Sequence, residues 1–144
     1  MRIAKPGDAA AMLALEALFP SDRMSARSIR RFIEAPTARV FVAVRGTEVL
    51  GNLVLLLRAN SRCARIYSVV VGPQARGLGI GNRLVEAAER AAKREGREAV
   101  SLEVRADNSA ALALYAKRGY VECQRLPMYY DDGADGCRLM RSLR

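Results

Sequence analysis

The spacing of hydrophobic and polar residues along the chain predicts a mixed α/β domain built around one strand–turn–helix unit. Ile66–Val71 is a β-branched and nearly uninterrupted apolar run, which predicts a strand buried on both faces. From Ile80 to Ala92 the apolar residues recur every three or four positions, so a helix is expected there that ends at Gly96. Between the two lies Gln74–Gly81, in which three glycines occupy alternate positions.

The flanking segments predict a short strand, two helices and a hairpin before this unit, and a strand, a helix and two strands after it. The ranges are 2–5, 9–19, a helix capped by Ser25 and running to Ala35, 39–45, 48–58, 98–105, 109–118, 120–130 and 137–143. This order indicates an α/β (α+β) fold with a mixed, mostly antiparallel sheet of six to seven strands and about four helices. No linker or repeat interrupts the 144 residues, so we expect a single domain over residues 1–144.

The amino-acid composition excludes several types of catalytic and metal site and indicates which partners to expect. The chain has no histidine, which rules out a Ser-His-Asp triad and zinc sites built on imidazole, and no metal is expected. Three widely spaced cysteines argue against a disulfide framework and, with no signal or membrane-spanning segment in view, favour the cytoplasm. The net charge of +9 favours a polyanionic partner, either a coenzyme or RNA. Because the basic residues are scattered among acids without interleaved aromatic residues, we expect no direct nucleic-acid function.

The glycine-rich turn at the start of a helix is a candidate anion site, because unpaired N–H groups and the helix dipole both favour a phosphate there. A dinucleotide-binding turn has the motif G-x-G-x-x-G, with glycine at its sixth position. Counted from Gly77 the sixth position is Asn82, and counted from Gly79 it is Leu84, so the motif is absent. A nucleotide-triphosphate loop would need a lysine, and none lies near the turn. The alternative is a turn that only packs the helix close to the sheet.

The remaining spacing, Arg76-x-x-Gly79-x-Gly81, resembles the acyl-coenzyme A pyrophosphate loop of the GNAT superfamily of N-acetyltransferases. The second half of the chain is similar to one branch of that superfamily, the bacterial ribosomal-protein N-terminal-alanine acetyltransferases. The matching residues are Leu102-Glu103-Val104-Arg105, Asn108, Ala110-Ala111, Leu114-Tyr115 and Gly119-Tyr120. Residues 1–60 agree with that branch only in their element order.

The resemblance implies a GNAT-like fold, acetyl-coenzyme A as cosubstrate, and a set of site residues. Glu103 would be the general base, Tyr115 the general acid, and Tyr129 and Tyr130 would line a peptide-entry groove. The coenzyme contacts would be Val69 and Val71 by backbone, Arg76, Gly77, Leu78, Gly79, Ile80, Gly81 and Asn82 around the pyrophosphate, and Asn108 toward the pantetheine.

Elementary acid–base chemistry favours an α-amine as acceptor, because the attacking amine must be neutral. A peptide α-amine has a pKa of about 7.7–8.0, whereas a lysine side chain is near 10.4 and asks for roughly 3–4 kcal/mol more. A glutamate is a weak base unless partial burial raises its pKa, and the position of Glu103 in mid-strand among apolar residues favours such burial. The alternatives are an exposed Glu103 paired with an arginine, Tyr115 as a core residue, and Tyr129 and Tyr130 as strand packing.

We therefore expect an acyltransferase that moves an acetyl group from acetyl-coenzyme A directly to a primary amine. The favoured partner is the N-terminal α-amine of a protein or peptide, with a ribosomal protein as one candidate. Two alternatives stay open: an acetyltransferase for a small-molecule amine, and a non-catalytic module that binds acyl-coenzyme A or RNA.

Overall fold

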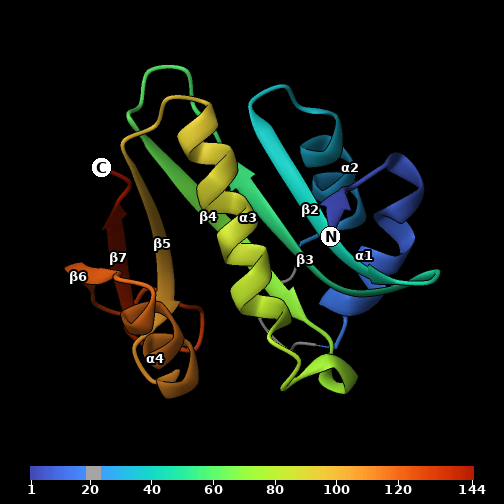
Figure 1. The fold of residues 1–144 in the computed structure, drawn as a ribbon. Helices are drawn as coiled ribbons and strands as arrows, with labels where there is room; N and C mark the ends of the chain where they lie inside the picture. Colours follow the sequence, from blue (N-terminus) through green and yellow to red (C-terminus); the bar gives the residue numbers. More distant parts are fainter. Residues whose placement is uncertain (19–23) are drawn as a thin grey trace.

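The computed structural model describes residues 1–18 and 24–144 (Figure 1). Within these residues seven strands form one sheet in the order β1-β2-β3-β4-β5-β7-β6. The strands are β1 (Arg2–Ile3), β2 (Ala38–Arg45), β3 (Glu48–Leu56), β4 (Cys63–Val71), β5 (Ala99–Arg105), β6 (Val121–Leu126) and β7 (Gly136–Ser142). The α-helices are α1 (Ala9–Glu16), α2 (Ala26–Glu34), α3 (Ile80–Arg94) and α4 (Ser109–Lys117), with 3-10 turns η1 (Pro6–Asp8) and η2 (Pro73–Ala75).

The predicted fold class is confirmed: the sheet is mixed, and in the described chain only β4 and β5 run parallel. The cap predicted at Ser25 is also present, because its hydroxyl accepts a hydrogen bond from the Ser28 amide. Most predicted ends lie within two residues of those in the structure, and two elements end clearly earlier than predicted. Helix α1 ends at Glu16, and the predicted end at Phe19 lies outside the described residues. Strand β6 stops at Leu126, because the following Pro127 has no N–H to donate to β7.

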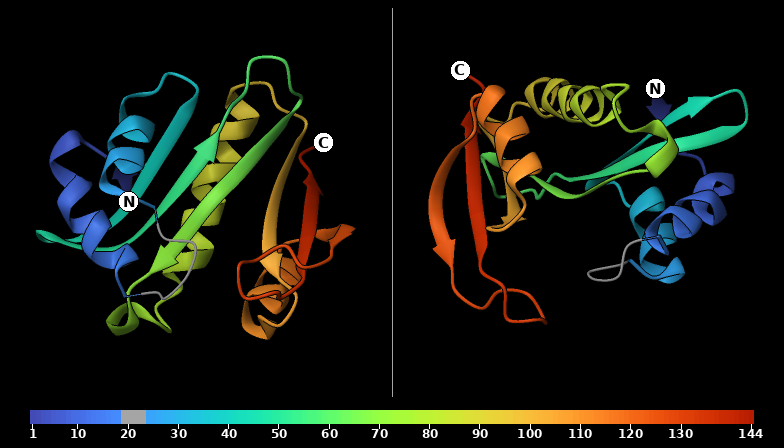
Figure 2. Two further views of the ribbon diagram at one scale, coloured as in Figure 1. Left: turned by 180° about the vertical axis from the view of Figure 1, so that it is seen from behind. Right: turned by 90° about the horizontal axis from the view of Figure 1, so that it is seen from below.

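Helices cover both faces of the sheet, with α1 and α2 on one face and α3 and α4 on the other (Figures 1 and 2). Under α3 lies the larger core cluster, in which Leu84, Val85 and Ala88 are fully buried. A second cluster under α1 and α2 is centred on Met12 and Ile29. The two clusters pack against opposite faces of the sheet, and the candidate site lies near its middle, between β4 and β5.

Strands β4 and β5 separate partway along their length. They pair only from Cys63–Ile66 to Ala99–Leu102, whereas β4 stays paired with β3 as far as Val71. The register between β3 and β4 shifts so that Tyr67 has no partner, which is a β-bulge placed directly after the last residue paired with β5. A bulge bends its strand and increases the local twist, so β4 turns away from β5 (Figure 1).

The prediction that Ile66–Val71 is buried on both faces is therefore wrong. The side chain of Tyr67 is 46% exposed, and the four residues after it are only half-buried. The physical reason is that this part of β4 has lost its neighbouring strand on one side. Its apolar side chains line a cleft instead of a closed core.

A buried ion cluster joins the elements on the α3 side of this cleft. The carboxylate of Glu89 on α3 accepts hydrogen bonds from Arg118, from Arg141 at 3.0 Å and from the Tyr120 hydroxyl at 2.8 Å. Burial alone would raise the pKa of Glu89, but the hydrogen bonds from Arg118 and Tyr120 outweigh it and lower that pKa. The cluster ties α3 to the end of α4 and to β7.

Candidate active site

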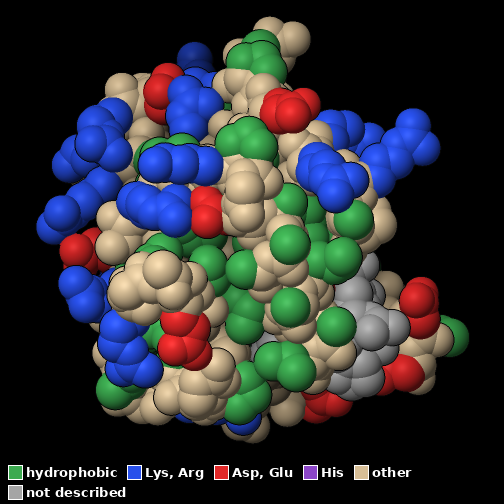
Figure 3. Space-filling model, turned by 90° about the vertical axis from the view of Figure 1, so that its right-hand side faces the viewer, with side chains coloured by type: hydrophobic (Ala, Val, Ile, Leu, Met, Phe, Trp, Pro, Cys, Tyr) green, Lys and Arg blue, Asp and Glu red, His purple; other side chains and the backbone are tan. Residues whose placement is uncertain are grey.

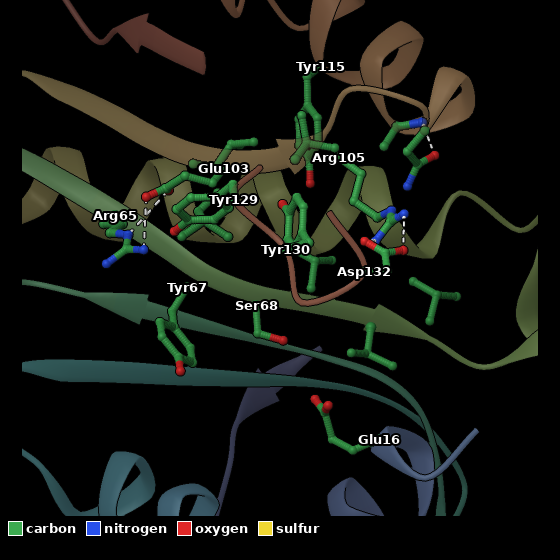
Figure 4. Close-up of a pocket in the computed structure, with 18 residues that line it drawn as sticks. Glu16, Arg65, Tyr67, Ser68, Glu103, Arg105, Tyr115, Tyr129, Tyr130 and Asp132 are labelled. Carbon is green, nitrogen blue, oxygen red and sulfur yellow. Dashed lines mark hydrogen bonds and ion pairs between the residues drawn. The ribbon is translucent and has the colours of Figure 1, made fainter. Parts of the chain in front are cut away.

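The cleft opened by β4 and β5 has a volume of about 960 Å³. One wall is formed by residues 65–71 of β4, and the other by residues 102–105 of β5 together with α4 and the β6–β7 connection (Figure 4). This size is in the range of a pocket for a cofactor or a drug-sized ligand.

Glu103 lies on the β5 wall as part of an ion-pair network. It is directly opposite Arg138 in the register of β5 with β7, and its Oε1 lies 3.3 Å from the Nη2 of that residue. The same oxygen is 2.8 Å from the Nη2 of Arg65 on β4 (Figure 4). The Glu103 side chain is only 7% exposed. The predicted arginine pairing is thus present, but on a buried carboxylate that has two guanidinium partners.

Tyr115 comes from α4 and combines a core ring with a hydroxyl group in the cleft. The ring is 7% exposed and packs edge-on against Tyr120, with centroids 5.5 Å apart. The hydroxyl points into the cleft (Figure 4). Burial raises the pKa of Tyr115 to about 12, so the group stays protonated at neutral pH and can act as a hydrogen-bond donor.

The glycine-rich turn leaves the start of α3 open. The first intrahelical hydrogen bond runs from the Arg83 amide to the Gly79 carbonyl, so within the described chain the amides of residues 79–82 have no backbone acceptor. Gly77 and Gly79 adopt φ values of +83° and +73°, which side chains rarely tolerate. A Cβ at either position would meet nothing within 4 Å. Conformation and not close packing therefore requires these two glycines.

The remaining residues of the turn divide into exposed side chains and one core side chain. Arg76 and Leu78 are exposed, whereas Ile80 is buried in the larger core cluster and can offer a ligand only its amide. The side chain of Asn82 is engaged, because its Oδ1 accepts a hydrogen bond of 2.8 Å from Arg118.

The other predicted coenzyme contacts lie on the cleft itself. Val69 and Val71 line the β4 wall. Asn108 lines the opposite wall and also caps α4, since its Oδ1 accepts a hydrogen bond of 3.1 Å from the Ala111 amide. The NH₂ end of Asn108 makes no hydrogen bond among the described residues and is left for a ligand.

Tyr129 and Tyr130 lie in the connection between β6 and β7 and reach over the cleft (Figure 4). Their rings meet edge to face, with centroids 5.0 Å apart. The guanidinium of Arg105 lies 5.2 Å from the centre of the Tyr130 ring and also binds Asp132 at 2.7 Å. These contacts hold the connection against β5, so the two tyrosines are not part of a strand as the sequence suggested.

One polar residue of the cleft was not identified from the sequence. Glu16, at the end of α1, is 3% exposed and lines the cleft on the side of β4 away from Glu103. Its Oε2 accepts a hydrogen bond of 3.2 Å from the Met24 amide. The available signal was spacing: Glu16 follows Met12 by four positions, which places a carboxylate on the buried face of the helix.

In the part of the chain that the structure describes, no three residues of the metal-binding types come together, and no helix is long and apolar enough to cross a bilayer. The positive charge is spread over the outer surface. On the face shown in Figure 3, Lys and Arg side chains gather at the upper and left borders with some acids among them, and hydrophobic side chains lie mainly in the middle.

Sequence and structure comparisons agree with this architecture. Residues 9–120 match the model of the acetyltransferase (GNAT) family, so the chain belongs to that family, as the glycine-rich turn suggested. Among the relatives, N-alpha-acetyltransferase MAK3 of Arabidopsis thaliana is 34% identical over 122 residues, which cover 83% of this chain. That alignment covers 64% of the Arabidopsis protein, so the chain spans less than two thirds of the length of this relative.

Two solved structures illustrate the fold. The ribosomal-protein-S18-alanine N-acetyltransferase of Escherichia coli superimposes with a TM-score of 0.89 at 21% identity, over 99% of this chain and 92% of its own. A chain of the NatC complex bound to Gag peptide and coenzyme A has a TM-score of 0.83 at 26% identity, with both chains fully covered.

Proposed function

We propose that this protein transfers an acetyl group from acetyl-coenzyme A to a primary amine, with the N-terminal α-amine of a protein as the favoured acceptor. One observation carries the proposal: the divergence of β4 and β5 brings the carboxylate of Glu103 and the hydroxyl of Tyr115 into one cleft, beyond which α3 begins with free amides. The class name of the Arabidopsis relative and the peptide and coenzyme in the NatC structure support the acceptor and donor assignments. A ribosomal protein is a candidate acceptor because of the likeness to the Escherichia coli enzyme.

The cleft suits a coenzyme A thioester, which would supply the acetyl group. The amides of residues 79–82 and the side chain of Arg76 would hold its diphosphate, because anions bind at the start of a helix. The backbone of Val69 and Val71, on the part of β4 that has no β5 neighbour, would pair with the pantetheine amides, and the NH₂ of Asn108 would donate from the other wall.

Glu103 would take the proton that the acceptor amine must lose. Its carboxylate lines the cleft, where the two arginines fix its position, and it would accept the proton through water. An α-amine needs little help, since its pKa is about 7.7–8.0 and much of it is already neutral at physiological pH. The same site would be a poor one for lysine side chains, whose pKa of about 10.4 leaves few of them neutral.

Tyr115 would stabilise the departing thiolate as a hydrogen-bond donor. Full proton transfer from a phenol with a pKa of about 12 to a thiol near 8.5 is uphill by about 5 kcal/mol. The buried hydroxyl therefore contributes by hydrogen bonding, and the thiolate takes its proton from solvent.

The proposed location is the cytoplasm, because Cys63, Cys123 and Cys137 are all free thiols in the structure. Tyr129 and Tyr130, which reach over the cleft, are proposed to contact the first residues of the acceptor peptide.

The test is to mix the purified protein with acetyl-coenzyme A and a peptide that begins with alanine, following thiol release and the mass of the peptide. The same peptide with a blocked N-terminus and an internal lysine is the matched control. We expect acetylation of the free peptide only. Turnover with a polyamine or an aminoglycoside but not with the peptide would favour a small-molecule acceptor. Coenzyme binding without turnover on any amine would contradict the enzymatic proposal.

A further inference from the structure

Three carboxylates line the cleft, and they differ in their partners. Glu103 is bound by two arginines, and both oxygens of Asp132 accept hydrogen bonds from Arg105. Glu16 forms no ion pair with any Lys or Arg of the described chain. Among the described residues, it is the one acidic group of this site whose charge is not balanced by a Lys or Arg side chain.

The surroundings of Glu16 leave one oxygen available. Its Oε2 accepts the hydrogen bond from the Met24 amide, while Oε1 is buried and has no partner among the described residues. The hydroxyl of Ser68, from the β4 wall, faces the carboxylate (Figure 4). Burial raises the pKa of Glu16, and the Met24 amide and the Ser68 hydroxyl oppose this rise only in part.

A buried carboxylate with an unpaired oxygen is costly unless a donor or a cation occupies the position beside it. A primary ammonium group supplies both, because it carries a positive charge and three N–H donors. Glu16 Oε1 and Ser68 Oγ together offer two acceptors on the same side of the cleft. A metal ion would need more ligands than these, and no further metal-binding side chains cluster here in the described residues.

We propose that Glu16 is the binding site for the ammonium group of the acceptor, with Ser68 as a second acceptor of its hydrogen bonds. The inference rests on the proposed function, in which the acceptor is an amine. Glu16 holds the ammonium group in the cleft, and the proton then leaves through water to Glu103. An acceptor with a hydroxyl or thiol in place of the amine lacks the positive charge and two of the three donors, so it gains much less from this site.

The test is the substitution Glu16→Gln in the full-length protein. Glutamine keeps an oxygen for the Met24 amide but removes the charge, so the fold is retained. Because hydrogen bonds to a charged carboxylate are the stronger ones, we expect the KM for the alanine peptide to rise at least about tenfold. The Kd for coenzyme A stays within about twofold of the wild type. The control is Glu34→Gln, which removes an exposed acid from α2 and changes neither value.

A folded Glu16→Gln protein with an unchanged KM for the peptide would overturn the inference. A loss confined to kcat would overturn it too, since Glu16 would then act in the chemical step and not in binding. If glutamine lowers the melting temperature by more than about 5 °C, Glu16→Met replaces it, because methionine fills the same space without polar atoms. The same rise in KM is expected of it.

The proposed function fails if the wild-type protein acetylates none of the amines, and that result is distinct from a failure of the inference on Glu16. The inference then depends on calorimetry with the alanine peptide and its Nα-acetylated form. Wild-type protein is expected to bind the free amine at least about tenfold more tightly, and Glu16→Gln to bind both forms alike. Equal binding of the two peptides by the wild type would overturn the inference as well.

Discussion

Replacing Tyr115 with phenylalanine isolates one hydroxyl group of the cleft. The ring packs in the core against Tyr120, and phenylalanine keeps that packing. In the described chain the hydroxyl has no hydrogen-bond partner whose loss would destabilise the fold. Tyr115→Phe should therefore leave the melting temperature and the Kd for coenzyme A nearly unchanged.

The expected loss lies in turnover. A hydrogen bond to a charged group contributes about 1.5–3 kcal/mol, so its removal from a developing thiolate should lower kcat by about 10- to 150-fold. The pH profile adds a second readout. Because the pKa of Tyr115 is raised to about 12, the hydroxyl stays protonated, and the wild-type rate should rise with deprotonation of the acceptor near pH 8 and stay level up to about pH 10.

Steady-state kinetics with thiol detection, at saturating coenzyme and over pH 6.5–10, measure both effects. A kcat within about twofold of the wild type would refute the role of the hydroxyl. The contrary result is a wild-type rate that declines as the pH rises, starting before about pH 10 is reached, while the Tyr115→Phe rate does not decline. That result would refute the conclusion that burial keeps the hydroxyl protonated. Tyr67→Phe is a suitable control, since it removes a hydroxyl from a partly exposed ring that lines the same cleft and has no proposed role in binding.

Three further substitutions test the supporting structure. Gly79→Ala forces a side chain into φ +73° and should cost about 1–2 kcal/mol of unfolding free energy. It should also weaken coenzyme binding, measured by calorimetry. Gly7→Ala is the control, because Gly7 has open space and an ordinary φ, and it should have neither effect. Glu89→Gln leaves two arginines without a carboxylate partner, one of them a third exposed, and should cost about 2 kcal/mol in urea unfolding at pH 7. Because the pKa of Glu89 is lowered in the fold, the difference in unfolding free energy between the two proteins should be full above about pH 4.3 and should shrink as the pH falls through the lowered pKa. A difference that does not change with pH would contradict a stabilising role of the Glu89 charge. Gly51→Ala places a Cβ 2.8 Å from the Val70 carbonyl and should lower the melting temperature, with a loss of about 1–3 kcal/mol; an unchanged melting curve would show that the two strands can move apart.

Features that depend on local sequence were predicted well. The order of the elements, the helix after the glycine-rich turn and the cap at Ser25 follow from hydrophobic spacing and from side chains a few positions apart. The open amides at the start of α3 follow in the same way, because Gly77 and Gly79 adopt backbone conformations that few other residues accept.

Features that depend on pairing between residues far apart in the sequence were not predicted. The exposure of β4 follows from where its pairing with β5 ends, and the apolar run Ile66–Val71 carries no mark of that position. The partners of Glu103 are Arg65 and Arg138, which are 38 and 35 residues away, so they depend on the register of three strands. Glu16 entered the site because α1 packs beside β4, and its spacing from Met12 was overlooked in a segment predicted as ordinary helix.

The unpaired Tyr67 makes the shape of the site a property of the backbone. Deleting this one residue would remove the bulge while keeping the pairing of β3 with β4 in step on both sides. The straightened strand could then continue alongside β5 beyond Leu102, and the hollow would be replaced by closed sheet. The cleft therefore exists because the chain has one extra residue at this point of β4. It is formed before any ligand binds, and it does not depend on the side chains that would contact the ligand.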